Sequence, residues 1–201
     1  MKNKLPILNA ALSETEIAEL SEKLLSAIRL NESIDEISDL VRKGADVNFV
    51  DAYGDTCLHN ACRHKNIDAT RLLIAKGANA NAKDKYGASP LFISLRNGGF
   101  GLEKILLEGG VNINERDECG NSLLKEACIY GNSDLVRFLL ENGVDVNERD
   151  QYGMSLLQRA CDYGRVNAAR ILIQYGGDIK EIDRYGNSLL HNACNKRNID
   201  V

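Results

Sequence analysis

The fold is decided by the stretch Asp51-Ala52-Tyr53-Gly54-Asp55-Thr56-Cys57-Leu58-His59-Asn60-Ala61-Cys62, because its pattern returns every 33 residues. The leading aspartate occurs in register at Asp51, Asp84, Asp117, Asp150 and Asp183. A glycine follows each aspartate after three residues, a serine or threonine after five, and a leucine after seven. Such agreement between segments predicts a tandem-repeat protein in which each unit packs against the next.

Each repeat carries the signals for a turn and two helices. The Asp-x-x-Gly segment predicts a turn, and the hydroxyl residue after it, such as Thr56, predicts the N-cap of a first helix. Lys65 and Arg197 replace the glycine that ends this helix in other repeats, so we expect strained or differently shaped turns there. The first helix is expected to end at Gly98, Gly131 and Gly164. The second helix is expected to begin at Asn66, Asn132 and Asn198. It is expected to end at Gly77, Gly110, Gly143 and Gly176.

This unit resembles the ankyrin repeat. The family hallmark Thr-Pro-Leu-His-x-Ala-Ala is echoed by Thr56-Cys57-Leu58-His59-Asn60-Ala61-Cys62 and by Ser188-Leu189-Leu190-His191-Asn192-Ala193-Cys194, and the family's end motif is similar to Gly44-Ala45-Asp46-Val47-Asn48. The clear resemblance covers residues 51–201. It implies an all-α ankyrin-repeat solenoid of stacked helix-turn-helix units with hairpin loops, in which the histidine hydrogen-bonds between neighbouring turns. Phe92, Lys125 and Gln158 replace that histidine, which weakens these local hydrogen bonds without threatening the fold.

The register divides the chain into units. Ser13 with Glu16, and Ser33 with Glu36, form capping-box patterns that predict a pair of helices shielding the first repeat. The expected units are a helical N-terminal cap, built as a degenerate repeat, over residues 1–50; four repeats over 51–83, 84–116, 117–149 and 150–182; and a partial C-terminal repeat over 183–201. The second helix of that last repeat is incomplete at Val201, so we expect a longer native chain or self-association through this uncapped repeat.

Composition and charge narrow the function classes. The chain has 201 residues and a formal net charge of −4, which argues against non-specific nucleic-acid binding. No apolar run approaches the ~18 residues of a membrane span, and Pro6 and Asn9 interrupt the short apolar stretch near the N-terminus that could be mistaken for a signal peptide. We therefore expect a cytoplasmic protein with neither nucleic-acid nor membrane partners; for a delivered bacterial effector the compartment would be the host cytosol.

The cysteines and histidines are expected to be structural. Neighbouring helices lie ~8–10 Å apart, whereas a disulfide needs Cα atoms within ~7 Å. The cysteines that share one register are therefore predicted to be reduced thiols in the core: Cys62, Cys128, Cys161 and Cys194. A helical turn of about 100° per residue spreads the side chains of Cys57, His59, Cys62 and His64 around the axis, so they do not form a zinc site. The sequence predicts no metal, no cofactor and no catalytic residue.

Candidate partner-binding residues follow from the resemblance, because ankyrin proteins use hairpin tips and first-helix ends to line a concave groove. Six of the seven tyrosines fall at these places, although hairpin-tip tyrosines can instead pack on neighbouring tips. The predicted partner-binding residues are Tyr53, Arg63, His64, Tyr86, Arg96, Arg116, Tyr130, Arg149, Tyr152, Tyr163 and Tyr185. The same register holds the cations Lys83, Lys85, Arg184 and Lys196 and only three acidic residues, Asp55, Glu118 and Asp162.

A basic, tyrosine-rich groove predicts a non-catalytic scaffold that binds another protein through an acidic or phosphorylated segment. The alternative is the recognition domain of a longer signalling protein, or of a secreted bacterial effector, whose catalytic domain lies beyond residue 201. The family also presents asparagines to a hydroxylase, and the corresponding residues are Asn48, Asn81, Asn114 and Asn147. Bonding of these side chains to the adjacent hairpin is their commoner role.

Overall fold

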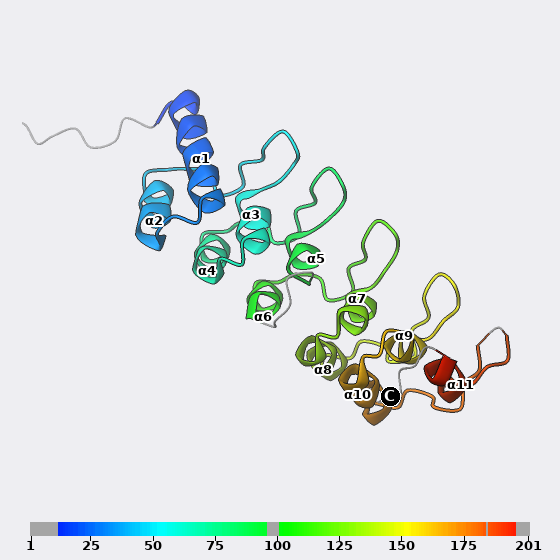
Figure 1. Cartoon of the computed structure of the whole chain (residues 1–201). Coiled ribbons are helices and arrows are strands. Elements are labelled where there is room, and N and C mark those ends of the chain that lie inside the picture. The colour runs from blue at the N-terminus through cyan, green and yellow to red at the C-terminus, as the bar shows by residue number, and fades with distance from the viewer. Residues whose placement is uncertain (1–11, 96–100, 184, 196–201) are drawn as a thin grey trace, which may run out of the picture.

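The computed structural model describes residues 12–95, 101–183 and 185–195, and these residues form helices joined by turns (Figure 1). The helices are α1 Glu14–Arg29, α2 Ile34–Arg42, α3 Cys57–Arg63, α4 Ile67–Ala75, α5 Pro90–Leu95, α6 Gly101–Glu108, α7 Leu123–Tyr130, α8 Ser133–Glu141, α9 Leu156–Asp162, α10 Val166–Gln174 and α11 Leu189–Asn195. The β-structure in the described ranges consists of isolated antiparallel bridges at the bases of hairpins: Val50 with Thr56, Arg116 with Ser122, Arg149 with Ser155 and Ile182 with Ser188. The all-α solenoid with hairpin loops is confirmed.

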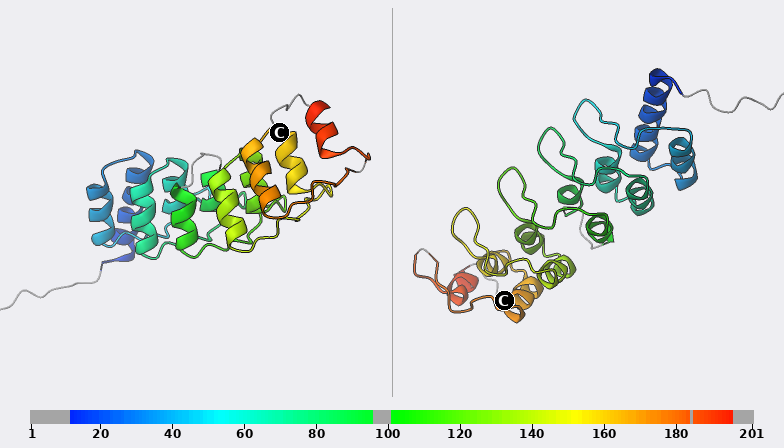
Figure 2. Two further views of the ribbon diagram at one scale, coloured as in Figure 1. Left: turned by 90° about the horizontal axis from the view of Figure 1, so that it is seen from below. Right: turned by 180° about the vertical axis from the view of Figure 1, so that it is seen from behind.

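The helices are arranged as a row of antiparallel pairs in two layers (Figures 1 and 2). The first helices α3, α5, α7, α9 and α11 contact one another in sequence order, and they form the layer next to the hairpin loops. The second helices α4, α6, α8 and α10 lie on the other side of the row. Every hairpin loop therefore projects from the same side of the molecule.

The helix starts agree with the sequence signals. The Ser122 hydroxyl accepts a hydrogen bond from the Lys125 amide at 3.1 Å, and the Asn66 side chain accepts one from the Ala69 amide at 2.9 Å. Asn132 caps α8 in the same way, whereas Asn198 lies outside the described residues. These bonds satisfy backbone donors that have no partner within the helix.

The turn between the paired helices needs a left-handed residue. Gly131 takes this conformation after α7 with φ of 76°, and Lys65 takes it after α3 with φ of 58°. A side chain at positive φ brings its Cβ close to the following carbonyl oxygen, so the Lys65 turn is strained as predicted. Arg197 lies outside the described residues.

The core runs through all the repeats as one cluster. Leu58, Leu91 and Leu124 occupy the same register in successive first helices and are fully buried. The thiols of Cys62, Cys128 and Cys161 lie four residues further along the first helices and are also buried. The side chain of Cys194 is not among those described. Each pair therefore shields the apolar side of its neighbour.

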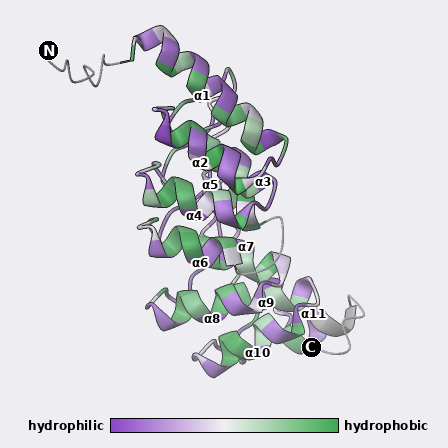
Figure 3. Cartoon of the chain, turned by 90° about the vertical axis from the view of Figure 1, so that its left-hand side faces the viewer, coloured by the Kyte–Doolittle hydropathy of each residue, from purple (hydrophilic) through white to green (hydrophobic). Residues whose placement is uncertain are grey.

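The helices α1 and α2 cover the first repeat. Both predicted capping boxes are present, at Ser13 with Glu16 and at Ser33 with Glu36. In Figure 3 hydrophilic and hydrophobic residues alternate along α1, and the residues buried from this helix include Leu24 and Ile28. Arg29 at its end bonds to Asn60 of α3 at 3.2 Å and pairs with Asp51. The α1–α2 pair is thus joined to the repeats by apolar packing and by an ion pair.

Two of the repeat asparagines connect neighbouring units. The Asn48 side chain accepts a hydrogen bond from the Asn79 amide at 2.7 Å and donates one to the Gly77 carbonyl at 3.3 Å. Asn81 makes the corresponding bonds to Asn112 and Gly110, at 3.2 and 3.5 Å. Hydroxylation of these asparagines stays a prediction.

Candidate functional site

The candidate site is built on five turns, which we call fingers 1 to 5 and which begin at Asp51, Asp84, Asp117, Asp150 and Asp183. In finger 1 the Asp51 carboxylate accepts hydrogen bonds from the amides of Tyr53 and Asp55, at 2.7 and 2.9 Å. Gly54 closes the turn at φ of 76° and donates its amide to the Asp51 carbonyl at 3.0 Å. The turn is therefore held by its own aspartate, and the third residue of each finger is left at the exposed tip. The finger face is the surface formed by these tips together with the first helices beside them.

Tyrosines dominate the exposed apolar surface of the finger face. The tip residues Tyr53, Tyr86, Tyr152 and Tyr185 are 56%, 66%, 58% and 74% exposed. Tyr130 and Tyr163, at the ends of α7 and α9, are 41% and 49% exposed. Exposed rings of this kind are common in protein interfaces, because tyrosine combines a large apolar area with a polar tip.

Two of the tips are already in contact with each other through a lysine. The Lys85 ammonium lies 3.9 Å from the centroid of the Tyr53 ring and 5.3 Å from that of Tyr86. The Lys85 amide also donates to the Tyr53 carbonyl at 3.1 Å. Fingers 1 and 2 are thus joined by cation–π contacts.

The cations at the bases of the fingers are paired with glutamates from the next finger. Lys83 lies 3.1 Å from Glu115. Arg116 lies 2.7 Å from Glu148, and Arg149 lies 3.3 Å from Glu181. The prediction of a basic groove counted the cations but omitted these glutamates, and it is corrected in this respect: each of these three cations has a carboxylate within ion-pair distance.

The glutamates were missed although the sequence contains a signal for them. Glu115, Glu148 and Glu181 recur with the same 33-residue period as the aspartates. Hydroxyl N-caps also bind two of them, since Ser89 donates to Glu115 at 2.5 Å and Ser155 donates to Glu181. A cation, a hydroxyl and a carboxylate therefore link fingers 2 and 3, and likewise fingers 4 and 5.

The remaining predicted contact residues have different surroundings. Arg63 forms a two-pronged ion pair with Asp55, with N–O distances of 2.8 and 3.0 Å, and this partner raises the pKa of the guanidinium. His64 is exposed at the end of α3. Arg96, Arg184 and Lys196 lie outside the described residues.

The family histidine forms a hydrogen bond between neighbouring fingers. The His59 ring bonds to the Thr56 amide and to the Ala88 carbonyl of the next finger, at 3.1 and 3.0 Å. Gln158 has the same register, and its side-chain oxygen accepts from the Ser155 amide at 3.0 Å, but its buried Nε2 atom has no hydrogen-bond partner. The bond between finger 1 and finger 2 thus has no counterpart from Gln158.

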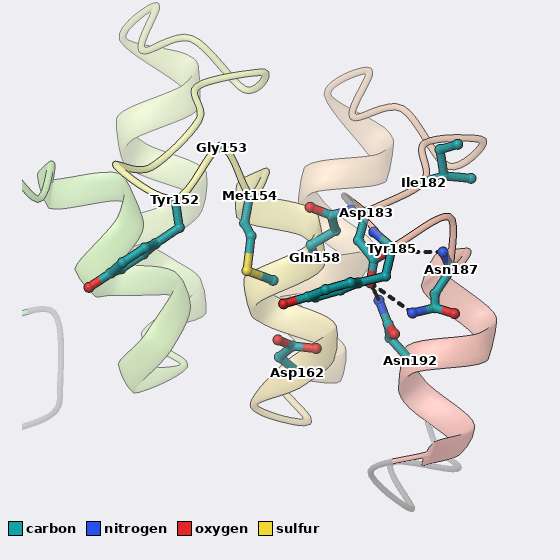
Figure 4. A pocket seen from close by; sticks show the side chains of 10 residues that line it. All are labelled: Tyr152, Gly153, Met154, Gln158, Asp162, Ile182, Asp183, Tyr185, Asn187 and Asn192. Atoms are coloured by element: carbon teal, nitrogen blue, oxygen red, sulfur yellow. Dashed lines mark hydrogen bonds between the residues drawn. The ribbon is translucent and has the colours of Figure 1, made fainter.

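A cavity of about 510 Å³ lies between fingers 4 and 5 at Gln158 (Figure 4). The side chains of Tyr152, Met154 and Tyr185 form its walls, with Asp162 at its edge. A second cavity, of about 230 Å³, lies at the same register between fingers 2 and 3 and is lined by Tyr86, Phe92 and Ile93. Both cavities open where the histidine is replaced by a residue that does not bond to the next finger.

The buried thiols and the placement of potential metal ligands bear on the chemistry that the described residues can support. Burial raises the pKa of the Cys57 and Cys62 thiols to about 12 and that of Cys161 to about 11, so the reactive thiolate form is disfavoured. In the described ranges no three His, Cys, Asp or Glu side chains gather closely enough to hold a metal ion. Among the helices of these ranges, none is long and apolar enough to cross a membrane.

Repeated helix pairs and a row of fingers with exposed tyrosines define a helical repeat protein of the kind that binds other proteins. The chain belongs to the ankyrin repeat family: the family profile described as ankyrin repeats (3 copies) matches residues 24–117, 102–183 and 124–201. No curated protein matches the chain in a sequence search. The resemblance inferred from the repeat motif is confirmed, and ankyrin repeats are in general protein–protein interaction modules.

Proposed function

We propose that the protein is a non-catalytic scaffold that binds a segment of another protein along the finger face. The observation that carries this proposal is the exposure of six tyrosines on the register that faces partners in this family. The proposed contacts are Tyr53, Tyr86, Tyr130, Tyr152, Tyr163 and Tyr185, together with Arg63, His64, Arg96, Arg116 and Arg149. A rigid row of repeats supports such binding, because little conformational entropy is lost on association.

The partner segment is proposed to be acidic or phosphorylated. The side chains of Arg116 and Arg149 are 52% and 54% exposed, whereas those of their partners Glu148 and Glu181 are only 14% and 5% exposed. The arginines therefore face the solvent with the carboxylates behind them. Because a guanidinium has five N–H donors, each arginine can bind an incoming carboxylate or phosphate while it keeps its glutamate.

A capture experiment with paired variants tests this function. Wild-type protein and the Tyr130→Ala/Tyr163→Ala and Arg116→Glu/Arg149→Glu variants are immobilised and exposed to cell extract, and Tyr175→Ala serves as the control because Tyr175 lies outside the finger register. We expect proteins that bind to wild type and to the control to be lost from both finger-face variants, and to be released by salt. Equal capture by all four proteins would contradict the proposal.

We place the scaffold in the cytoplasm. The support is that no disulfide joins the cysteines whose side chains are described, Cys57, Cys62, Cys119, Cys128 and Cys161, as is usual in a reducing compartment. Self-association through the fifth repeat stays a prediction. Leu190 of α11 is 73% exposed, and it offers an apolar contact for a second copy. Sedimentation of wild type against Leu190→Asp tests this, and identical monomeric behaviour would contradict it.

A further inference from the structure

The two cavities on the finger face are copies of one site. Tyr86, Phe92 and Asp117 line the first cavity, and their counterparts two repeats further on, Tyr152, Gln158 and Asp183, line the second. The neighbouring glycines Gly87 and Gly153 correspond in the same way. A cavity that recurs at the same register has a common structural cause rather than a local packing accident.

What the two cavities share is a replaced residue at the histidine register. His59 joins fingers 1 and 2 through its bond to the Ala88 carbonyl. The Lys125 ammonium donates a hydrogen bond to the Asn121 side chain, and it lies 3.8 Å from the Asp150 carboxylate of finger 4. The Phe92 ring has no polar atom to bond with the next finger, and the Nε2 atom of Gln158 is unpartnered although the residue is only 2% exposed. Phe92 and Gln158 therefore supply no counterpart of the His59 bond between fingers 2 and 3 or between fingers 4 and 5.

The walls of both cavities combine aromatic rings with polar groups: Asp162, Asp183, Asn187 and Asn192 also line the cavity at Gln158, and Asp117, Glu118 and Glu126 also line the cavity at Phe92. Tyr152, Met154 and Tyr185 line the cavity at Gln158, and Figure 4 shows Met154 between the two tyrosines with the Tyr185 ring extending toward it. The cavity at Phe92 has the aromatic rings of Tyr86 and Phe92. Burial of a large apolar side chain in either cavity would remove aromatic surface from water, which is the usual basis of an interface anchor.

In the order of the repeats, the two half-exposed arginines fall between the cavities. Arg116 stands at the base of finger 3 and Arg149 at the base of finger 4, and each has its glutamate on the protein side. Packed helices are ~8–10 Å apart, so two repeats span about 20 Å, and an extended chain that rises ~3.3 Å per residue covers this distance in about six residues.

From this geometry we propose that the scaffold binds an extended acidic segment with two large apolar side chains about six residues apart, one in each cavity, and with carboxylates or phosphates between them on Arg116 and Arg149. This inference rests on the proposed function and specifies its partner. The cavities supply the apolar anchors and the arginines supply the charge complementarity. The order of cavity, arginine, arginine and cavity along the row sets the pattern of the segment.

A random peptide library displayed on phage, selected against the full chain, tests the pattern. We expect enriched peptides to carry two large apolar residues five to seven positions apart with acidic residues between them. Alanine at either apolar position should weaken binding by about tenfold or more. Gln158→His restores the family residue and should close its cavity, and Tyr185→Ala removes one wall at a residue that is 74% exposed. Each should weaken binding about tenfold, with Tyr175→Ala as the unaffected control.

The outcomes separate this inference from the function on which it rests. Peptides that bind Gln158→His and Tyr185→Ala as tightly as wild type, or that lack the paired anchors, overturn the two-cavity inference. If such peptides still fail to bind Arg116→Glu/Arg149→Glu, the proposed finger-face function stands without the two-cavity inference. Absence of enrichment, or enriched peptides that bind every finger-face variant equally, counts against both.

Discussion

The guanidinium of Arg116 lies 2.7 Å from the carboxylate of Glu148, although the two residues belong to successive repeats. The Arg149–Glu181 pair repeats this relationship one unit later at 3.3 Å. Such pairs bridge successive fingers, with the arginine outward and the carboxylate inward. The same contacts therefore contribute to the stacking of the repeats and to the charge that a partner would meet.

The first prediction concerns the nearly buried carboxylate of Glu181. Glu181→Ala removes the acceptor for both Ser155 and Arg149, so we expect a loss of ~1–3 kcal/mol in the free energy of unfolding. Arg149→Ala leaves the Glu181 carboxylate bonded to Ser155 and should cost less than Glu181→Ala. Urea denaturation followed by circular dichroism measures both values, and a larger loss in Arg149→Ala would contradict this division of roles.

The second prediction concerns Glu103 in α6, which is only 1% exposed and has an Oε1 atom without a hydrogen-bond partner. Burial raises the pKa of this carboxyl above its ordinary value. As the pH rises through the unfolded-state pKa, the unfolded chain ionises first, so Glu103 lowers the free energy of unfolding until its raised folded-state pKa is passed. Glu103→Val, which copies Val136 at the same register, should stabilise the protein by ~1–3 kcal/mol at neutral pH.

The stability of wild type and of Glu103→Val is compared by urea denaturation between pH 4 and pH 8, a span of about four units around the usual glutamate pKa. The gap between the two proteins should widen as the pH rises. A constant gap would show that the Glu103 pKa does not differ between the folded and unfolded chains.

The third prediction has the opposite pH dependence. Burial opposes ionisation of Asp150, but the Arg159 guanidinium and the amides of Tyr152 and Met154 outweigh it, and the pKa of this carboxyl is lowered. Its contribution is present above the unfolded-state pKa and is lost as the pH falls through the folded-state pKa. Asp150→Asn should therefore be less stable than wild type at neutral pH, with the difference shrinking in acid. Thermal unfolding at a series of pH values follows this, and a difference that grows in acid would disprove it.

The fourth prediction concerns the strained turn after α3. Lys65→Gly should stabilise the protein by ~1 kcal/mol, because glycine adopts the observed φ of 58° without a Cβ clash. Gly131→Ala is the matched reverse change, since its added Cβ would stand 3.0 Å from the Arg165 side chain at φ of 76°. Thermal melting should move up in the first variant and down in the second. A decrease in both would mean that the Lys65 side chain makes contacts that outweigh the strain.

Sequence reasoning predicted the parts of the fold that depend on local chemistry. The capping roles of Thr56 and Asn66 and the left-handed turn at Lys65 follow from residue type and spacing, because each involves atoms only a few residues apart. The charge of the finger face was less predictable, because Lys83 meets Glu115 from the next finger and a count of cations does not include that contact. The cavity at Gln158 could not be predicted, since it depends on whether a side chain reaches across to the following finger.

Hydrogen–deuterium exchange of the full chain, with and without the tightest library peptide, tests the central claim most directly. We expect slowed exchange in fingers 2 to 5 and in the adjoining first helices α5, α7 and α9, with the second helices α4, α8 and α10 unchanged. Protection confined to those second helices, with the fingers unaffected, would contradict it.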